Sequence, residues 1–250
     1  MSQDLIYPGG KVRLFVNADL GEHAQVQLSD AQSHYLIHVM RARVGRRVRL
    51  FNGRDGEWAA TVCEAGRRGA ILSCEDRTGP QIDVPDVWLL FAPIKRVPAD
   101  YVAQKATELG ARVLQAVLTR RTIATRVNLD RLRANAIEAA EQSGRVTVPD
   151  VRPPLPLPTL LAAWDSARTL IFCDEAREAK PIARALADRH RVPCAILTGP
   201  EGGFDAEERA LLRGLSFVLP VALGARILRA DTAALAALAV WQSLRGDWEH

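Results

Sequence analysis

The chain has 250 residues, of which 48% are hydrophobic and 25% are charged, and this balance is typical of a globular protein. No apolar run approaches the roughly 18 residues that a membrane-spanning helix needs. The first residues lack the basic start and apolar core of a signal peptide. We therefore expect a cytoplasmic protein with no membrane partner. The formal net charge is +4, and most of the cations are arginines, whose planar guanidinium suits phosphates and base edges.

The first part of the chain predicts a small β-rich domain. Strand patterns occupy residues 12–16, 47–51, 57–65 and 69–76, and a helical pattern over residues 29–40 begins at a cap-like Ser29. Several short strands with one helix favour a small β-barrel. Residues 77–86 then carry two prolines and several turn-forming residues, which mark a domain boundary. We expect one domain over residues 1–78 and a second over residues 79–250.

From residue 86 onward, strand and helix patterns alternate. Strands are predicted over residues 87–93, 112–119, 168–174, 192–200 and 216–223. Helices are predicted over residues 99–110, 128–144, 180–190, 205–215 and 231–246, with Asn128 as an N-cap and Gly110 as a terminator. A proline-rich connection at residues 153–164 enters a further helix. This alternation predicts an α/β domain with a mainly parallel sheet.

The four cysteines, at positions 63, 74, 173 and 194, all lie in apolar, strand-like runs without CxxC spacing. We expect buried thiols rather than a disulfide framework. His34 and His38 are four residues apart on one helical face, but no third ligand is near them in sequence, so no metal site is expected.

A glycine-rich loop follows the apolar run at residues 194–197. Its sequence, TGPEGG at residues 198–203, lacks the lysine and hydroxyl of a P-loop and does not match a dinucleotide fingerprint. Glu201 would also repel a phosphate. The loop therefore favours a neutral or cationic ligand, and the alternative is a tight structural turn.

A second loop, LGARILRADTAAL at residues 223–235, also lies between a strand and a helix. Gly224 permits an unusual backbone or a close approach, and Asp231 or Thr232 is a candidate helix cap. Strand carboxyl ends form the ligand crevice of an open α/β sheet, so the two loops are expected to share one site.

The pair LTGPEGGF and LGARILRADTAAL resembles the C-terminal signature of the SPOUT methyltransferases, and within that class the bacterial 16S ribosomal RNA (uridine-N3) methyltransferase family. Upstream, RLFV and HYLIHVMRARVGRRVRLFNG resemble that family's N-terminal RNA-binding, PUA-like barrel. QKATELG and EAAEQSGR resemble its central helices, so the match covers nearly the whole chain. The chain departs from the family at Ala230 and Asp231, where a threonine and a glutamate are common.

The resemblance implies a C-terminal domain with a deep trefoil knot, a homodimer, and S-adenosylmethionine bound between the two loops. Its sulfonium is a cation, which accounts for Glu201. Apolar walls and close backbone approach would come from both loops. The cofactor-binding residues expected on this basis are Leu197, Thr198, Gly199, Glu201, Gly203, Leu219, Leu223, Gly224, Ile227 and Leu228.

The implied target, uridine N3, carries a proton at neutral pH, so methylation requires its removal or stabilisation of the developing anion. Our hypothesis gives Arg229 the role of stabilising negative charge on the uracil carbonyl. Asp231 is the second catalytic candidate, as proton acceptor or as the group that orients Arg229, and the alternative is a helix cap.

Two arginine-rich segments are candidates for binding RNA. The first, at residues 41–49, holds five arginines, and the second, at residues 118–133, holds five against one acid. Such clusters attract phosphate backbones, whereas a solvated face is the alternative. Arg145 lies on a polar helix face that fits RNA contacts, an interface or salt bridges equally well. The RNA-binding residues expected are Arg41, Arg43, Arg46, Arg47, Arg121 and Arg145.

The sequence thus predicts an S-adenosylmethionine-dependent enzyme that methylates N3 of a uridine in 16S ribosomal RNA, in the small subunit or a late precursor. Two alternatives stay open. One is a SPOUT enzyme with another target such as transfer RNA, and the other is an RNA-binding protein without catalysis.

Overall fold

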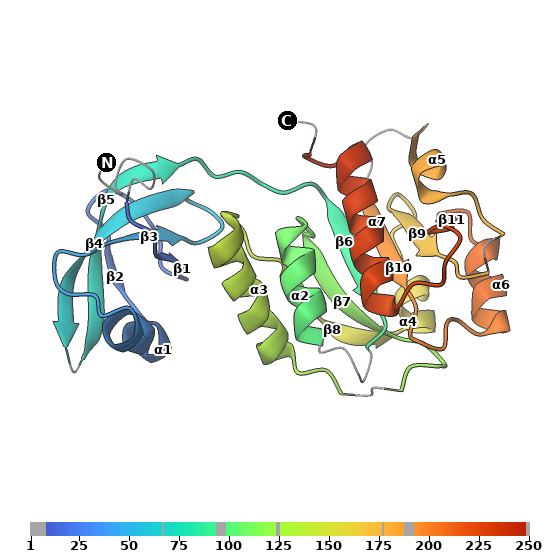
Figure 1. Cartoon of the computed structure of the whole chain (residues 1–250), viewed down its shortest axis with the longest axis horizontal. Coiled ribbons are helices and arrows are strands. Elements are labelled where there is room, and N and C mark those ends of the chain that lie inside the picture. Colours follow the sequence, from blue (N-terminus) through green and yellow to red (C-terminus); the bar gives the residue numbers. More distant parts are fainter. Residues whose placement is uncertain are drawn as a thin grey trace. The chain divides into compact units, whose positions relative to one another are not determined.

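The computed structural model describes residues 9–66, 68–93, 99–123, 126–176, 178–187 and 193–248. The chain divides into two compact units, which we treat separately (Figure 1). Unit 1 consists of Met1–Asp83 and Ala140–Val148, and unit 2 of Val84–Ala139 and Pro149–His250. A single boundary near residue 79 stays a prediction of the sequence, which gave no sign that residues 140–148 would join the first unit.

Unit 1 is built on a five-stranded sheet in the order β1-β3-β4-β5-β2. Its strands are β1 (Arg13–Phe15), β2 (Gln25–Gln27), β3 (Arg47–Phe51), β4 (Glu57–Gly66) and β5 (Gly69–Gly79). β1 pairs with β3 in parallel, and the other pairs are antiparallel. The predicted small β-domain is therefore confirmed. β2 was missed, although residues 24–28 alternate apolar and polar side chains.

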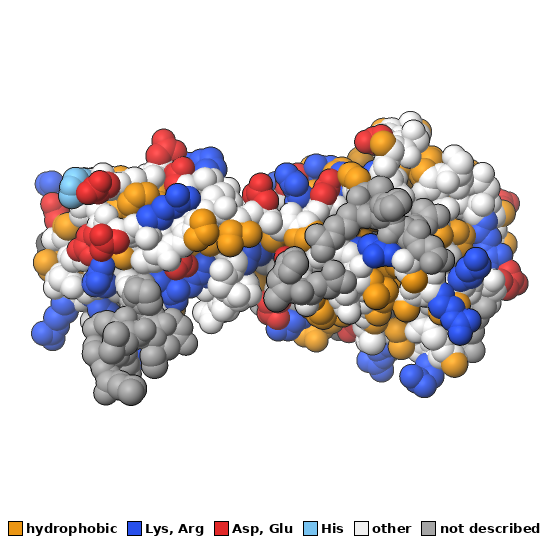
Figure 2. Space-filling view, turned by 90° about the horizontal axis from the view of Figure 1, so that it is seen from above, with side chains coloured by type: hydrophobic (Ala, Val, Ile, Leu, Met, Phe, Trp, Pro, Cys, Tyr) orange, Lys and Arg blue, Asp and Glu red, His pale blue; other side chains and the backbone are white. Residues whose placement is uncertain are grey.

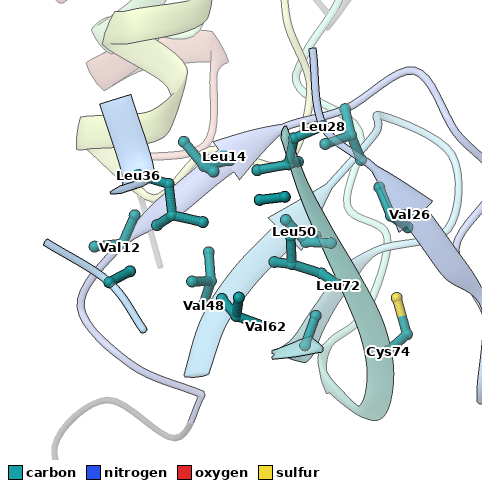
Figure 3. Packing of buried hydrophobic residues seen from close by; sticks show 14 of the residues in the cluster. Val12, Leu14, Val26, Leu28, Leu36, Val48, Leu50, Val62, Leu72 and Cys74 are labelled. Atoms are coloured by element: carbon teal, nitrogen blue, oxygen red, sulfur yellow. The ribbon is translucent and has the colours of Figure 1, made fainter. Parts of the chain in front are cut away.

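The predicted helix over residues 29–40 is divided in two. α1 (Asp30–His34) begins with a capping box between Ser29 and Gln32, and Tyr35–Val39 continues as a π-helix. Leu36 points from this segment into the core of unit 1, where Val26, Val48 and Leu50 are also fully buried (Figure 3). Burial of these aliphatic side chains is what holds the helix against the sheet.

Unit 2 is built on a six-stranded sheet in the order β11-β9-β10-β6-β7-β8, in which every pair is parallel. Its strands are β6 (Val87–Phe91), β7 (Val113–Leu118), β8 (Asp150–Pro156), β9 (Thr169–Cys173), β10 (Cys194–Thr198) and β11 (Val218–Val221). The predicted parallel α/β sheet is confirmed. The prediction of a proline-rich connection was wrong in part, because residues 150–156 form β8. β8 is an edge strand, and edge strands tolerate proline's missing N–H.

Among the residues that the structure describes, six helices lie wholly or partly in unit 2, namely α2 (Ala99–Glu108), α3 (Leu129–Ser143), α4 (Leu157–Ala162), α5 (Ile182–Ala187), α6 (Ala206–Gly214) and α7 (Ala230–Arg245). α7 packs beside α2 and over β10 and β6 (Figure 1). Leu160 of α4 and Leu212 of α6 join Phe172 of β9 in a buried apolar cluster. The knot that the resemblance implies stays a prediction.

Two predicted helix ends are confirmed, at Asn128 and at Gly110. Asn128 Oδ1 accepts the Arg131 backbone N–H at 3.0 Å and caps α3. Gly110 follows α2 with φ +79°, and a Cβ there would collide with the Gln242 side chain. Gln242 is fully buried and donates to the Leu109 carbonyl at 2.7 Å, so this glycine also lets α7 dock against the end of α2.

The four cysteines form no disulfide, but the expectation that all are buried was wrong, because Cys63 is exposed. No described helix has the length and apolarity needed to cross a membrane. Within the same residues, no three His, Cys, Asp or Glu side chains gather to hold a metal.

Candidate functional site

The two glycine loops meet at one pocket of unit 2. They follow the carboxyl ends of β10 and β11, and the loop after β9, the strand between them, joins them. Because the three strands are parallel, these loops leave the sheet at the same edge. The pocket measures about 420 Å³, within the ordinary range for small-molecule sites.

Most of the expected site residues line this pocket. They are Thr198, Gly199, Glu201, Gly203, Leu223, Gly224, Ile227, Leu228 and Arg229. Leu197 lies instead in the fully buried cluster around Phe172 and is not a lining residue. Leu219 lies in β11, also outside the lining.

The two catalytic candidates lie in different surroundings at the start of α7. Arg229 is the N-cap residue, is exposed and borders the pocket. Asp231 lies in the first turn, next to a smaller hollow lined also by Val102 of α2. Its Oδ1 accepts the Thr232 backbone N–H at 2.7 Å. Neither Asp231 nor Thr232 is therefore the N-cap residue.

Seven further residues line the pocket that the sequence analysis had not assigned to the cofactor, namely Cys173, Asp174, Glu175, Pro200, Arg226, Ala230 and Ala233. Cys173, Asp174 and Glu175 come from the end of β9. The signal that would have found them is a pair of acids directly after a buried strand. Burial raises the pKa of the Cys173 thiol to about 12, so this thiol stays protonated at neutral pH.

Asp174 is a buried carboxylate held by two arginines of α6. Its side chain is 0% exposed and lies 2.6 Å from Arg213 Nη2 and 3.4 Å from Arg209 Nε. A buried charge needs such partners, because its own desolvation is costly. The pair of guanidiniums compensates the negative charge at the base of the pocket and fixes the end of β9 to α6.

Glu175 holds the first glycine loop from the β9 side. Its Oε1 accepts the Phe204 backbone N–H at 3.0 Å and pairs with Arg209 Nη2 at 2.6 Å. Gly203 has φ +66°, and a Cβ there would collide with the Glu175 carboxylate. A Cβ at Gly199 would approach the Phe204 ring to 2.7 Å. Gly199 is therefore required by close packing against Phe204, which is fully buried, and Gly203 by its positive φ and by the Glu175 carboxylate beside it.

The mouth of the pocket combines charges of both signs with exposed apolar surface. Glu201 is exposed on one wall, whereas Arg226 and Arg229 are exposed on the other. Ile227 between them is 81% exposed. An exposed isoleucine at a pocket mouth is suited to packing against a bound ligand or partner.

The arginines expected to bind RNA differ in their surroundings. Arg41, Arg43 and Arg46 are exposed, whereas Arg47 pairs with Glu75 at 3.0 Å. Figure 2 shows basic and acidic side chains interspersed on the face that it presents, so no single-sign surface covers it. Arg121 donates to the Gly202 carbonyl, and Arg145 donates to Thr147 Oγ1 at 2.9 Å.

Comparisons with known proteins identify the family. A family model described as an RNA methyltransferase domain matches residues 81–242, and one described as an RNA methyltransferase PUA domain matches residues 28–73. The chain belongs to the RNA methyltransferase family. This confirms the predicted resemblance and the two-part organisation of α/β methyltransferase fold and PUA-like domain.

Relatives within this family extend over most of the chain. Ribosomal RNA small subunit methyltransferase E of Rickettsia conorii is 31% identical, with 91% of this chain and 93% of the relative covered. The protein of the same name from Synechocystis is 34% identical over 91% of this chain and 76% of the relative.

Two solved structures similar to this chain hold a ligand. Ribosomal RNA small subunit methyltransferase E of Neisseria gonorrhoeae, bound to S-adenosylmethionine, is 30% identical, with a TM-score of 0.82 and coverage of 95% and 99% of the two chains. A Legionella pneumophila methyltransferase in complex with the same cofactor is 26% identical, with a TM-score of 0.83 and coverage of 94% and 98%.

Proposed function

We propose that the protein methylates N3 of a uridine in 16S ribosomal RNA of the small subunit, with S-adenosylmethionine as methyl donor. The observation that carries this proposal is a pocket of about 420 Å³ lined by both glycine loops. It belongs to a chain whose relatives are small-subunit methyltransferases and whose structural neighbours hold S-adenosylmethionine.

The pocket fits this cofactor in size and in chemistry. When bound, S-adenosylmethionine supplies an electrophilic methyl group on a cationic sulfur. Glu201 places an exposed carboxylate on the lining, where a cation is favoured, whereas the Glu175 carboxylate is already paired with Arg209. Ala230 and Ala233 contribute only methyl side chains on the α7 side and leave space for an adenosine. Leu223 and Leu228 offer apolar walls for its ring.

The chain's own chemical task is to make uridine N3 nucleophilic. As the bond between N3 and the methyl carbon forms, the bond from that carbon to sulfur would break with its electron pair left on the sulfur, and the N3 proton must pass to a base as negative charge spreads onto the adjacent carbonyl oxygens. The exposed guanidinium of Arg229, at the pocket edge, is suited to stabilise that charge. Asp231 is the candidate proton acceptor, and its short side chain lies two residues further into α7.

RNA binding is proposed for the surface arginines of unit 1, above all Arg41, Arg43 and Arg46, with Arg47 and Arg145 as further candidates. Arg121 of unit 2, the remaining arginine that the sequence assigns to RNA, donates instead to the Gly202 carbonyl of the first glycine loop. The exposed guanidiniums can neutralise phosphates, and a uridine must be unpaired or flipped to reach the pocket. We further propose that the protein acts in the cytoplasm as a homodimer on the small subunit or a late precursor.

A methylation assay tests the function. Purified protein with radiolabelled S-adenosylmethionine is incubated with small subunits, 16S RNA and transfer RNA from a strain that lacks the gene, and nuclease digests are analysed by mass spectrometry. We expect N3-methyluridine in 16S RNA. Label in transfer RNA alone would point to another substrate, and absence of label together with no calorimetric binding of S-adenosylmethionine would leave a non-catalytic RNA-binding protein.

Catalytic roles are tested by single-turnover methylation. Replacement of Arg229 by alanine is expected to slow methyl transfer by about 100-fold or more, because one stabilising donor is lost. Asp231→Asn tests whether Asp231 accepts the N3 proton. A near-normal rate of methyl transfer at saturating RNA would show that it does not.

A further inference from the structure

The first glycine loop accepts a hydrogen bond from Arg121, a residue that the sequence analysis assigned to RNA binding. Arg121 lies in the connection that follows β7, and its Nη1 donates to the Gly202 carbonyl at 2.8 Å. A Cβ built on Gly202 would lie 3.7 Å from both Cβ and Cδ of Arg121, so the arginine side chain runs along this glycine in ordinary contact. Glu175 holds the other side of the same loop, at Gly203 and Phe204.

The turn that carries Arg121 is itself fixed to the start of α6. The Arg120 backbone N–H donates to Glu208 Oε1 at 2.8 Å, and Arg120 Nη1 lies 2.9 Å from Asp205 and 2.5 Å from Glu207. These acids raise the pKa of Arg120. Thr122 Oγ1 accepts the Thr119 N–H at 2.9 Å and shapes the turn. The Arg121 side chain is therefore presented to Gly202 from an anchored backbone.

The loop needs such support because of its composition. Three of its residues, Gly199, Gly202 and Gly203, are glycines, and glycine loses more backbone freedom on ordering than any other residue. If the loop is already ordered before the ligand binds, the loss of backbone entropy does not weaken binding. Hydrogen bonds from a charged donor are the stronger ones available for this purpose.

We propose that Arg121 is a positioning residue of the methyl-donor site. Its guanidinium holds the Gly202 carbonyl and thereby keeps the Gly199–Gly203 loop in the shape that lines the pocket. Arg121 then contributes to cofactor affinity from outside the pocket and not to the grip on RNA phosphate. This inference rests on the proposed function of the pocket.

Calorimetry with S-adenosylmethionine alone tests the proposal. Arg121→Ala is expected to weaken cofactor affinity about tenfold, the effect of one charge-assisted hydrogen bond. In steady-state assays the KM for the methyl donor should rise about as much, while kcat and the affinity for RNA change less than about twofold. Arg121→Lys, which keeps the positive charge but not the planar guanidinium, should restore part of the affinity.

Arg126→Ala is the matched control, because it removes the same charge from the same connection. The part of the chain that the structure describes offers Arg126 no hydrogen bond or ion pair, so its loss should leave cofactor affinity unchanged. An Arg121→Ala protein with unchanged cofactor affinity and weakened RNA binding would overturn the proposal.

Hydrogen exchange followed by mass spectrometry separates this inference from the proposed function. In Arg121→Ala or Arg121→Lys protein without ligand, amides of residues 199–204 should exchange faster, while those of β10 keep their protection. Unchanged exchange in the loop would sink the proposal even if the wild type methylates RNA. If wild-type protein binds no S-adenosylmethionine, the proposed function fails, while the exchange experiment still decides whether Arg121 holds the loop.

Discussion

The two arginine-rich segments look alike in sequence and differ in what surrounds them. In the first, at residues 41–49, the side chains of Arg41, Arg43 and Arg46 are exposed, and no described residue pairs with them. In the second, at residues 118–133, most arginines have a partner. Arg120 and Arg121 grip the start of α6 and the glycine loop, Arg131 lies 2.5 Å from Asp100, and Arg133 lies 3.3 Å from Asp130.

This difference shows that the number of acidic residues nearby in sequence does not tell whether a cluster of arginines is free to bind RNA phosphates. Asp205 is 85 residues from Arg120 along the chain, yet the two side chains are 2.9 Å apart. Such partners already occupy the guanidiniums that phosphates would need. The first segment is therefore the better candidate for binding RNA phosphates. Most arginines of the second segment instead make ion pairs or hydrogen bonds within the protein.

The largest effect is expected on the free energy of unfolding when a buried arginine, Arg13, is replaced instead of one of these exposed arginines. Its side chain is 4% exposed, pairs with Glu57 at 2.6 Å, and donates to the carbonyls of Ala140 and Glu141 near the end of α3. Arg13→Ala should lower the free energy of unfolding by about 3 kcal/mol, because Glu57 and the carbonyls lose a buried partner. Urea denaturation measures this.

Arg46→Ala is the control for that experiment and should change the unfolding free energy by less than about 0.5 kcal/mol, as exposed substitutions usually do. Equal losses in the two variants would contradict the division into structural and available arginines.

An intermediate effect is expected on RNA binding. The double replacement Arg43→Gln with Arg46→Gln should reduce the magnitude of the slope of log K against log salt by about 1.4, since each lost phosphate contact on single-stranded RNA is worth about 0.7. The double replacement Arg131→Gln with Arg133→Gln removes the same charge from the second segment. It should reduce the magnitude of the salt slope by less than half as much. Filter binding between 50 and 300 mM salt, as about six concentrations, gives the slopes. A larger change in the second pair would reverse our comparison.

The smallest effect is expected in the pH dependence of stability that comes from the ion pair between Arg120 and Asp205. A hydrogen bond from the Glu208 N–H, and then the Arg120 side chain, lower the pKa of Asp205 below its ordinary value of 3.8. The stabilisation is therefore complete above about pH 4 and is lost as the pH falls through the lowered, folded-state pKa. Asp205→Asn keeps an N-cap side chain but not the charge. Melting temperatures of the two proteins should differ slightly at pH 6, and the difference should narrow as the pH falls below about 4; a constant difference would count against the charge effect.

Local patterns were sufficient for much of the fold. Alternating strand and helix periodicities predicted the parallel sheet of unit 2, and the caps at Asn128 and Gly110 were found because caps depend on neighbouring residues. β8 was missed because its prolines obscure a strand, and only its edge position in the sheet makes them tolerable. The split of the first helix into α1 and a π-helix also left no periodic signal.

The sequence by itself determined the two glycine loops, their shared pocket and the family, because these depend on short motifs and on parallel strands ending at one edge. Only the tertiary structure decided that β9 supplies Asp174 and Glu175, that Leu197 belongs to the core, and that Arg121 faces Gly202. The physical reason is sequence separation. A periodic pattern is set by residues a few positions apart, whereas these contacts join segments whose proximity depends on the order in which the strands assemble.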